Sequence, residues 1–184
     1  RLALSLVVRP GFDSNVPQLP GVVTPASLGA ADRADGDLQL LAAVSLRPVP
    51  AIGLSIEELA SYRQQFRLAE WSLFTNAVGP RYRFAGLRDR VAVGYDFEVH
   101  VLGGKLLDLG HVAQAAYARE LRGGWRLGGR YLFRYRDYRD SFAPFTGQSH
   151  QAAVEATWGA PDRPYEIGAA ALVLREATAD PTFA

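Results

Sequence analysis

Apolar side chains occupy every second position of residues 90–102, whose sequence is RVAVGYDFEVHVL. They stand at the odd-numbered positions from Val91 to Val101, while the positions between them carry small or polar residues such as Asp96 and Glu98. Because successive side chains of a β-strand point to opposite faces, this segment predicts a long strand with one wholly apolar face. Whether that face contacts a protein core or lipid decides the class of the protein.

The same period of two recurs along the chain and predicts about nine strands. They are expected at residues 2–8, 38–46, 59–66, 71–84, 90–102, 109–122, 125–138, 150–158 and 165–177. One segment has a second interpretation, because Ser55 and Glu58 fit the Ser-x-x-Glu capping box that begins many helices. Since helical patterns are scarce elsewhere in the chain, we prefer a hairpin joined at residues 67–70. Pro80 then lies inside its second strand, which is tolerable at an edge or a bulge.

The lengths of the predicted strands and of the loops between them both favour a membrane-spanning barrel over a soluble sheet. Several predicted strands reach the ~9–11 residues that a tilted membrane-spanning strand needs, whereas strands of soluble domains average about 5–6. Short connections are expected at one end of the sheet and longer ones at the other, as in outer-membrane barrels. The short ones are 48–51, 85–89, 122–124 and 159–164, and the long ones are 10–36, 103–108 and 139–149, with 67–70 as an exception.

Aromatic residues are predicted to gather at both ends of the strands. Beside the short turns stand Tyr82, Phe84, Trp125, Trp158 and Tyr165, and near the longer loops stand Phe66, Trp71, Tyr135 and Tyr138. Two such rims are typical of the aromatic girdles of a membrane barrel. A frequent occurrence of Tyr and Phe in any strand is the simpler alternative.

The composition of the chain argues against several classes of site and partner. The formal net charge is +1, from 20 Lys and Arg against 19 Asp and Glu, so charge gives no argument for a nucleic-acid partner. The chain contains no cysteine, which excludes disulfides and thiolate metal sites. No run approaches the ~18 consecutive apolar residues of a membrane-spanning helix, although a closed barrel spans lipid without one.

Five stretches resemble the porin-like β-barrels of tetratricopeptide-repeat outer-membrane proteins of Gram-negative bacteria. They are RPGFDSNVPQLP, SYRQQFRLAE, VGPRYRF, VAVGYDFEVHVLGGK and RYLFRYRDYRDSFAPFTGQSHQAAVEATW. The group includes barrels of exopolysaccharide-export proteins and of surface lipoprotein assembly modifiers, and the resemblance implies a barrel in the bacterial outer membrane. None of these motifs is catalytic.

The chain also departs from that pattern. It shows no helical repeat of about 34 residues, and its final residues, DPTFA, lack the aromatic terminus of such barrels. Bacterial single-chain barrels have an even number of strands. We therefore expect residues 1–184 to be a single all-β domain, an antiparallel up-and-down transmembrane barrel with about 8–10 visible strands, that is incomplete at one or both ends.

A row of arginines is the most conspicuous polar feature of the predicted strands. We predict lumen-lining positions for seven residues: Arg126, Arg130, Arg134, Arg136, Asp96, Glu98 and Glu155. The arginines could attract an anionic substrate such as phosphate or an acidic polysaccharide. Alternatively, they pair with the three carboxylates and fill the interior of a narrow barrel.

No catalytic or metal site is expected. His111 and His150 each stand near the start of a strand and Asp108 is close by, but their spacing is no ligand signature. Ser149 and His150 are neighbours on a strand and so point to opposite faces. No cofactor motif is present, since the segments LGG and RGG join strands rather than opening a helix.

The sequence thus predicts an outer-membrane barrel that acts as a pore, an export channel or a membrane-anchored scaffold. Its expected partners are outer-membrane lipid and periplasmic or other envelope proteins. Two alternatives stay open: a soluble lipocalin-like barrel, with its apolar face inside around an apolar ligand, and a barrel enzyme that acts on lipid.

Overall fold

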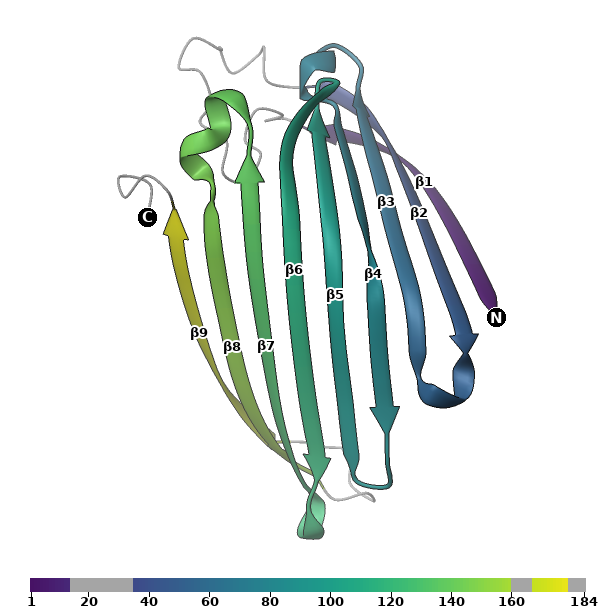
Figure 1. Cartoon of the computed structure of the whole chain (residues 1–184), viewed down its shortest axis with the longest axis vertical. Helices are drawn as coiled ribbons and strands as arrows, with labels where there is room; N and C mark the ends of the chain where they lie inside the picture. Colours follow the sequence, from purple (N-terminus) through teal and green to yellow (C-terminus); the bar gives the residue numbers. More distant parts are fainter. Residues whose placement is uncertain (14–34, 160–166, 179–184) are drawn as a thin grey trace.

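One antiparallel β-sheet accounts for nearly all of the described chain (Figure 1). The computed structural model describes residues 1–13, 35–159 and 167–178. Its nine strands follow one another in sequence order across the sheet, each pairing with its neighbours along the chain. The strands are β1 (Leu2–Asp13), β2 (Asp35–Val49), β3 (Leu54–Gln65), β4 (Leu73–Ala85), β5 (Asp89–Leu102), β6 (Lys105–Glu120), β7 (Trp125–Tyr138), β8 (Gly147–Trp158) and β9 (Ile167–Thr178). The prediction of an all-β, up-and-down fold is confirmed.

The helix considered for residues 55–71 is absent. Ser55 and Glu58 both lie in β3, and the Ser55 hydroxyl donates a hydrogen bond to the Glu57 carboxylate at 3.1 Å instead of capping a helix. A short 3₁₀ turn, η3 (Ala69–Trp71), follows within the connection to β4. The alternation of apolar and polar residues therefore outweighs the local capping signal.

The expected division between short and long connections is only partly correct. Where a loop was expected at 103–108, Gly103 and Gly104 form a tight turn with φ of 56° and 80°, and β6 already begins at Lys105. At the other end, 159–166 is longer than the neighbouring turns, which include the 3₁₀ turns η2 (Pro50–Ile52) and η4 (Arg122–Gly124). The connection 139–146, which holds η5 (Asp140–Phe145), is long as expected, and residues 14–34 lie outside the described part.

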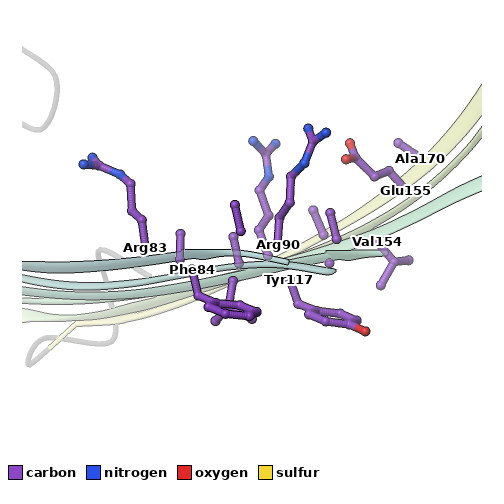
Figure 2. A pocket seen from close by; sticks show the side chains of 15 residues that line it. Arg83, Phe84, Arg90, Tyr117, Val154, Glu155 and Ala170 are labelled. Atoms are coloured by element: carbon purple, nitrogen blue, oxygen red, sulfur yellow. The ribbon is translucent and has the colours of Figure 1, made fainter. Parts of the chain in front are cut away.

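The register gives the sheet two faces of different chemistry, with exceptions on β9, where Arg175 lies on the apolar face and Leu172 and Leu174 lie on the ionic face. The apolar face carries Leu4, Val44, Val93, Phe97, Tyr131 and Val154, among others, and the ionic face carries Arg81, Asp96, Glu98, Arg130, Arg134 and Glu155, among others. Figure 2 shows the division edge-on: Arg83, Arg90 and Glu155 project from one side, and Phe84, Tyr117 and Val154 project from the other. The ribbon rises toward the side of the arginines at one end of that view.

Burial is inverted relative to a soluble domain. Among the described residues, Val112 is the sole buried apolar residue. The buried polar residues are Asp35, Asp37, Ser55, Gln65, Ser72, Asp96 and Asp108. Large apolar residues such as Leu4 (73%) and Val154 (63%) are widely exposed. The buried side chains of the described residues are therefore mostly polar, while many large apolar side chains are exposed.

The strands are progressively staggered along one another. A single row of paired residues starts at Leu54, the first residue of β3, and passes through Tyr82, Val93 and Ala115 to Tyr131, near the middle of β7. A stagger in one direction means that strands are inclined to the axis around which such a sheet curls, as in barrels.

Pro80 is accommodated by a local interruption of the sheet. The pairing of β4 with β5 stops at Val78–Phe97 and resumes at Arg81–Gly94. Gly79 is required there, because a Cβ at this position would lie 1.7 Å from the Tyr95 carbonyl oxygen. Pro80, which has no N–H to donate, thus stands where the ladder is already broken.

Glycines on the ionic face make room for charged side chains from the neighbouring strand. A Cβ on Gly94 would lie 2.6 Å from Cδ of Arg81, and one on Gly128 would lie 2.7 Å from Oε1 of Glu155. The same relation joins Gly110 to Glu98, at 3.0 Å. Each of these charged side chains therefore lies flat over a glycine.

We predict that Gly94→Ala lowers the free energy of unfolding by about 1–3 kcal/mol. The added methyl group displaces Arg81, which pairs with the buried Asp96 carboxylate at 2.6 Å. The matched control is Gly129→Ala on the apolar face of β7, where a Cβ meets only the Ala153 carbonyl oxygen at 3.8 Å. Urea titration of both variants is the measurement. Equal stability of the two variants would show that the position of the Arg81 side chain does not depend on the absence of a Cβ at Gly94.

Candidate functional site: the ionic face

All seven residues predicted to line a lumen lie on the ionic face. On β7 the arginines alternate with apolar-face residues, and the register places Arg134 opposite Val112 and Arg136 opposite Gly110 on β6. The same rows continue to Asp96 and Glu98 on β5. On β8, Glu155 is opposite Gly128. The structure thus brings these side chains to one surface.

Glu98 reaches across a whole strand to the arginines of β7. Its Oε2 atom lies 3.9 Å from Nε of Arg134 and 3.8 Å from Nη2 of Arg136. Gly110 of β6 lies between them and has no side chain to obstruct the contact. These separations exceed hydrogen-bond length, so the contact is an ionic attraction rather than a hydrogen bond. Glu98 is therefore a partner of two arginines, as the sequence suggested.

Asp96 pairs with β4 rather than with β7. Its Oδ2 accepts a hydrogen bond from Nη2 of Arg81 at 2.6 Å, with both side chains largely buried. Arg81 also lies 3.7 Å from Glu57. With its amide oxygen turned toward Arg81, Gln114 accepts from both terminal nitrogens at 3.0 Å. The alternative in which Asp96 pairs with the β7 arginines is wrong, because Arg81 reaches Asp96 from the adjacent strand β4.

Sequence reasoning missed the contribution of β3 and β4 to this network. Arg83 makes a two-pronged contact with Glu57, at 2.6 Å and 3.1 Å. Arg63 of β3 donates to Asp37 of β2 at 2.8 Å. The signal was present in PRYRFA, where Arg81 and Arg83 alternate with Tyr82 and Phe84 exactly as the arginines of β7 alternate with aromatic residues.

Three of the predicted residues have no ion-pair partner within the described chain. No carboxylate of that part lies within 4.0 Å of the guanidinium nitrogens of Arg126 or Arg130, and Glu155 pairs with no cation there. The expected pairing of Glu155 with the arginine row is therefore wrong. Arg126 is the second residue of β7, whereas Arg130 stands further along the strand.

A hollow of about 460 Å³ lies beside Arg130. Arginines from three strands stand around it: Arg83 of β4, Arg90 of β5 and Arg130 of β7. Its base is formed by small residues, namely Ala92, Ala116, Ala118 and Ala153. In Figure 2 the side chains of Arg83, Arg90 and Glu155 rise from the same side of the sheet. The arrangement can receive a solute whose charge complements the guanidinium groups.

The histidines do not form a common site. His100 contacts Asp108 at 2.8 Å on the ionic face. His111 and His150 lie on the apolar face, where they hydrogen-bond to the Tyr95 and Tyr131 hydroxyls, respectively. Within the described residues, no three His, Asp or Glu side chains gather as a metal ion would require.

Comparisons of the chain with protein-family models, with curated proteins and with solved structures give no match. Within the described residues, none of the helices has the length and apolar character needed to cross a membrane.

A double-mutant cycle should distinguish the ion pairs of this face by their burial. For Arg81→Gln and Asp96→Asn, whose side chains are 17% and 11% exposed, we expect a coupling energy of about 1–3 kcal/mol. For Arg90→Gln and Glu120→Gln, which are 65% and 46% exposed, solvent screening should leave about 0.2–1 kcal/mol. Chemical unfolding measures both. A coupling no larger for the buried pair would contradict the assigned network.

Proposed function

We propose that this sheet forms part of the wall of a transmembrane β-barrel in a bacterial outer membrane. In this proposal the apolar face contacts lipid and the ionic face lines an aqueous interior. The protein would serve as a pore, an export channel or a membrane-anchored scaffold of an envelope complex. The observation that carries the proposal is the inverted burial, with charged residues packed together and apolar residues exposed.

The apolar face is too extensive for a surface that is exposed to water. Soluble monomers rarely expose a continuous apolar patch larger than a few hundred Å². Here exposed apolar residues follow one another across the sheet, for example Leu4 on β1, Ile56 on β3, Val93 on β5 and Val173 on β9. Lipid satisfies such a surface without any covering layer.

Backbone hydrogen bonding places a condition on this proposal. Each strand from β2 to β8 is paired on both sides, whereas β1 and β9 are the two edges of the described sheet. Lipid cannot satisfy the free N–H and C=O groups of an edge strand. Because nine alternating strands leave β1 and β9 running in the same direction, an all-antiparallel barrel requires an odd number of additional strands between them.

Aromatic residues near one end of the sheet support the assignment of a membrane interface. Trp125 and Trp158 are paired across β7 and β8, and the Trp158 indole donates to the Gly123 carbonyl oxygen at 2.9 Å. The Tyr117 hydroxyl donates to Asp89 at 2.6 Å. Aromatic rings with one polar contact suit the boundary between lipid and water. Tyr165, predicted for the same rim, lies outside the described residues.

Some polar groups on the apolar face are hydrogen-bonded to each other, which reduces the cost of placing them in lipid. Asn76 donates to the exposed Glu58 carboxylate at 2.8 Å. The two histidine–tyrosine pairs on β5–β6 and β7–β8 have the same character. Glu58 is the most costly of these groups if it remains charged in lipid.

The direct test is folding of the full chain into vesicles of phosphatidylcholine and phosphatidylglycerol. We expect folded protein to resist extraction by urea, and to migrate differently on a gel when heated and unheated samples are compared. A monodisperse monomer that folds without detergent and ignores the vesicles would contradict the proposal. That result would favour the soluble barrel with an apolar interior.

Two substitutions of alanine by arginine on the same strand test which face of the sheet contacts lipid. Ala115 lies on the apolar face of β6 and Ala118 lies on its ionic face, opposite Arg90 and near Glu120 and Glu155. We expect Ala115→Arg to lower the free energy of folding into vesicles by about 2–4 kcal/mol near the membrane midplane. Ala118→Arg, which adds the same charge, should cost far less. Equal costs would mean that the two faces do not differ in their contact with lipid.

A further inference from the structure

The geometry points to a polyanion-binding site in the alanine-floored hollow of the ionic face, with Arg130 as its principal residue. We call this hollow the arginine trough; its residues are Arg83, Arg90, Arg130, Glu155 and the alanines 92, 116, 118 and 153. The inference rests on the proposed function, in which the ionic face is open to water. It adds a ligand class, a solute with several phosphate or carboxylate groups.

Register explains why the trough is open. One row of the ionic face reads Arg83, Ala92, Ala116, Arg130 and Ala153 from β4 to β8. The next row reads Ala85, Arg90, Ala118, Gly128 and Glu155. Long charged side chains thus alternate with methyl groups or hydrogen, which leaves space between the guanidinium groups. A second hollow shares Arg83, Arg130 and three of the alanines and extends the trough toward Arg81 and Gln114.

The cations of the trough differ in how strongly they are neutralised. Arg83 makes a two-pronged contact with Glu57, and Arg90 has one exposed contact with Glu120 at 2.9 Å. Arg130 has no carboxylate within ion-pair distance among the described residues, and its side chain is exposed. Five N–H donors therefore face the trough without an anionic acceptor.

Glu155 is the carboxylate that lines the trough, and it opposes anion binding. It has no ion-pair partner in the described chain, and its Oε1 atom lies against Gly128, 2.7 Å from where a Cβ would stand. Glu155 is therefore a trough residue that lies against the sheet at Gly128. Removal of its charge should strengthen the binding of an anion.

The spacing of the arginines selects an extended ligand. Arg83 and Arg130 stand in one row and are separated by three strand spacings, about 14 Å. Arg90 lies between them in the adjacent row. A chain of anionic groups matches this spacing, whereas a single phosphate would contact all three guanidinium groups only if the arginine side chains converged. Arginine forks match both phosphate and carboxylate oxygens, so the probes must separate these two chemistries.

Calorimetric titration of the folded full chain in detergent micelles tests the site. The probes are inorganic tripolyphosphate, citrate and inorganic phosphate. We expect tripolyphosphate or citrate to bind more tightly than inorganic phosphate, and the affinity to fall as salt is raised. Arg130→Gln should weaken binding about tenfold or more, because it removes charged hydrogen bonds. Glu155→Gln should strengthen it.

Arg126→Gln is the matched control. It removes the same charge from the same strand, and Arg126 likewise has no ion-pair partner among the described residues but lies outside the trough. We expect this variant to bind like the parent. Equal weakening in both variants would show non-specific attraction to β7, and unchanged binding in Arg130→Gln would overturn the site.

The outcomes separate the two proposals. Binding in micelles does not require insertion into vesicles, so a chain that binds tripolyphosphate through Arg130 and ignores vesicles contradicts only the membrane proposal. A chain that inserts into vesicles and binds none of the three probes contradicts only the arginine trough.

Discussion

Neutralisation of charge across neighbouring strands is the interaction on which this structure depends. A fixed antiparallel register places every second side chain on the same face, so charged residues of neighbouring strands meet one another from β2 to β7. Glu57, Arg81 and Asp96 form a continuous series over three strands, and Glu98 joins β5 to the arginines of β7. Without these contacts the face would carry desolvated charges, which are costly when unpaired.

The positions of glycine and alanine determine where a charged side chain reaches a counter-charge and where a space is left between the charged side chains. Over Gly94 and Gly110 a long side chain lies flat and reaches its counter-charge. Around Arg130 the opposite residues are Ala116 and Ala153, and no carboxylate of the described chain comes within ion-pair distance. The same face therefore contains a closed region, which supports the sheet, and an open one, which is available to solute. Pairs in the closed region are better shielded from water than the exposed Arg90–Glu120 pair.

The period of two was sufficient to predict the strands, since it is repeated over long segments. Residues 125–138 were predicted to the residue, and residues 90–102 to within one position. It also placed all seven candidate residues on one face. Partners could not be predicted, because a pair such as Arg81–Asp96 depends on the register between strands, which pattern alone does not give. The turn at Gly103–Gly104 was missed since its positive φ values allow a tighter connection than a loop.

The orientation of the two faces is the central claim, and the absence of cysteine makes it directly measurable. Single cysteines at successive positions of 91–101 can carry a nitroxide label in protein folded into vesicles. Oxygen concentrates in lipid, and a polar nickel chelate concentrates in water. If the apolar face contacts lipid, oxygen collides most with labels at the odd-numbered positions, from Val91 to Val101, and the nickel chelate collides most with those between them. The reverse alternation, or nickel access at every position, would contradict this orientation.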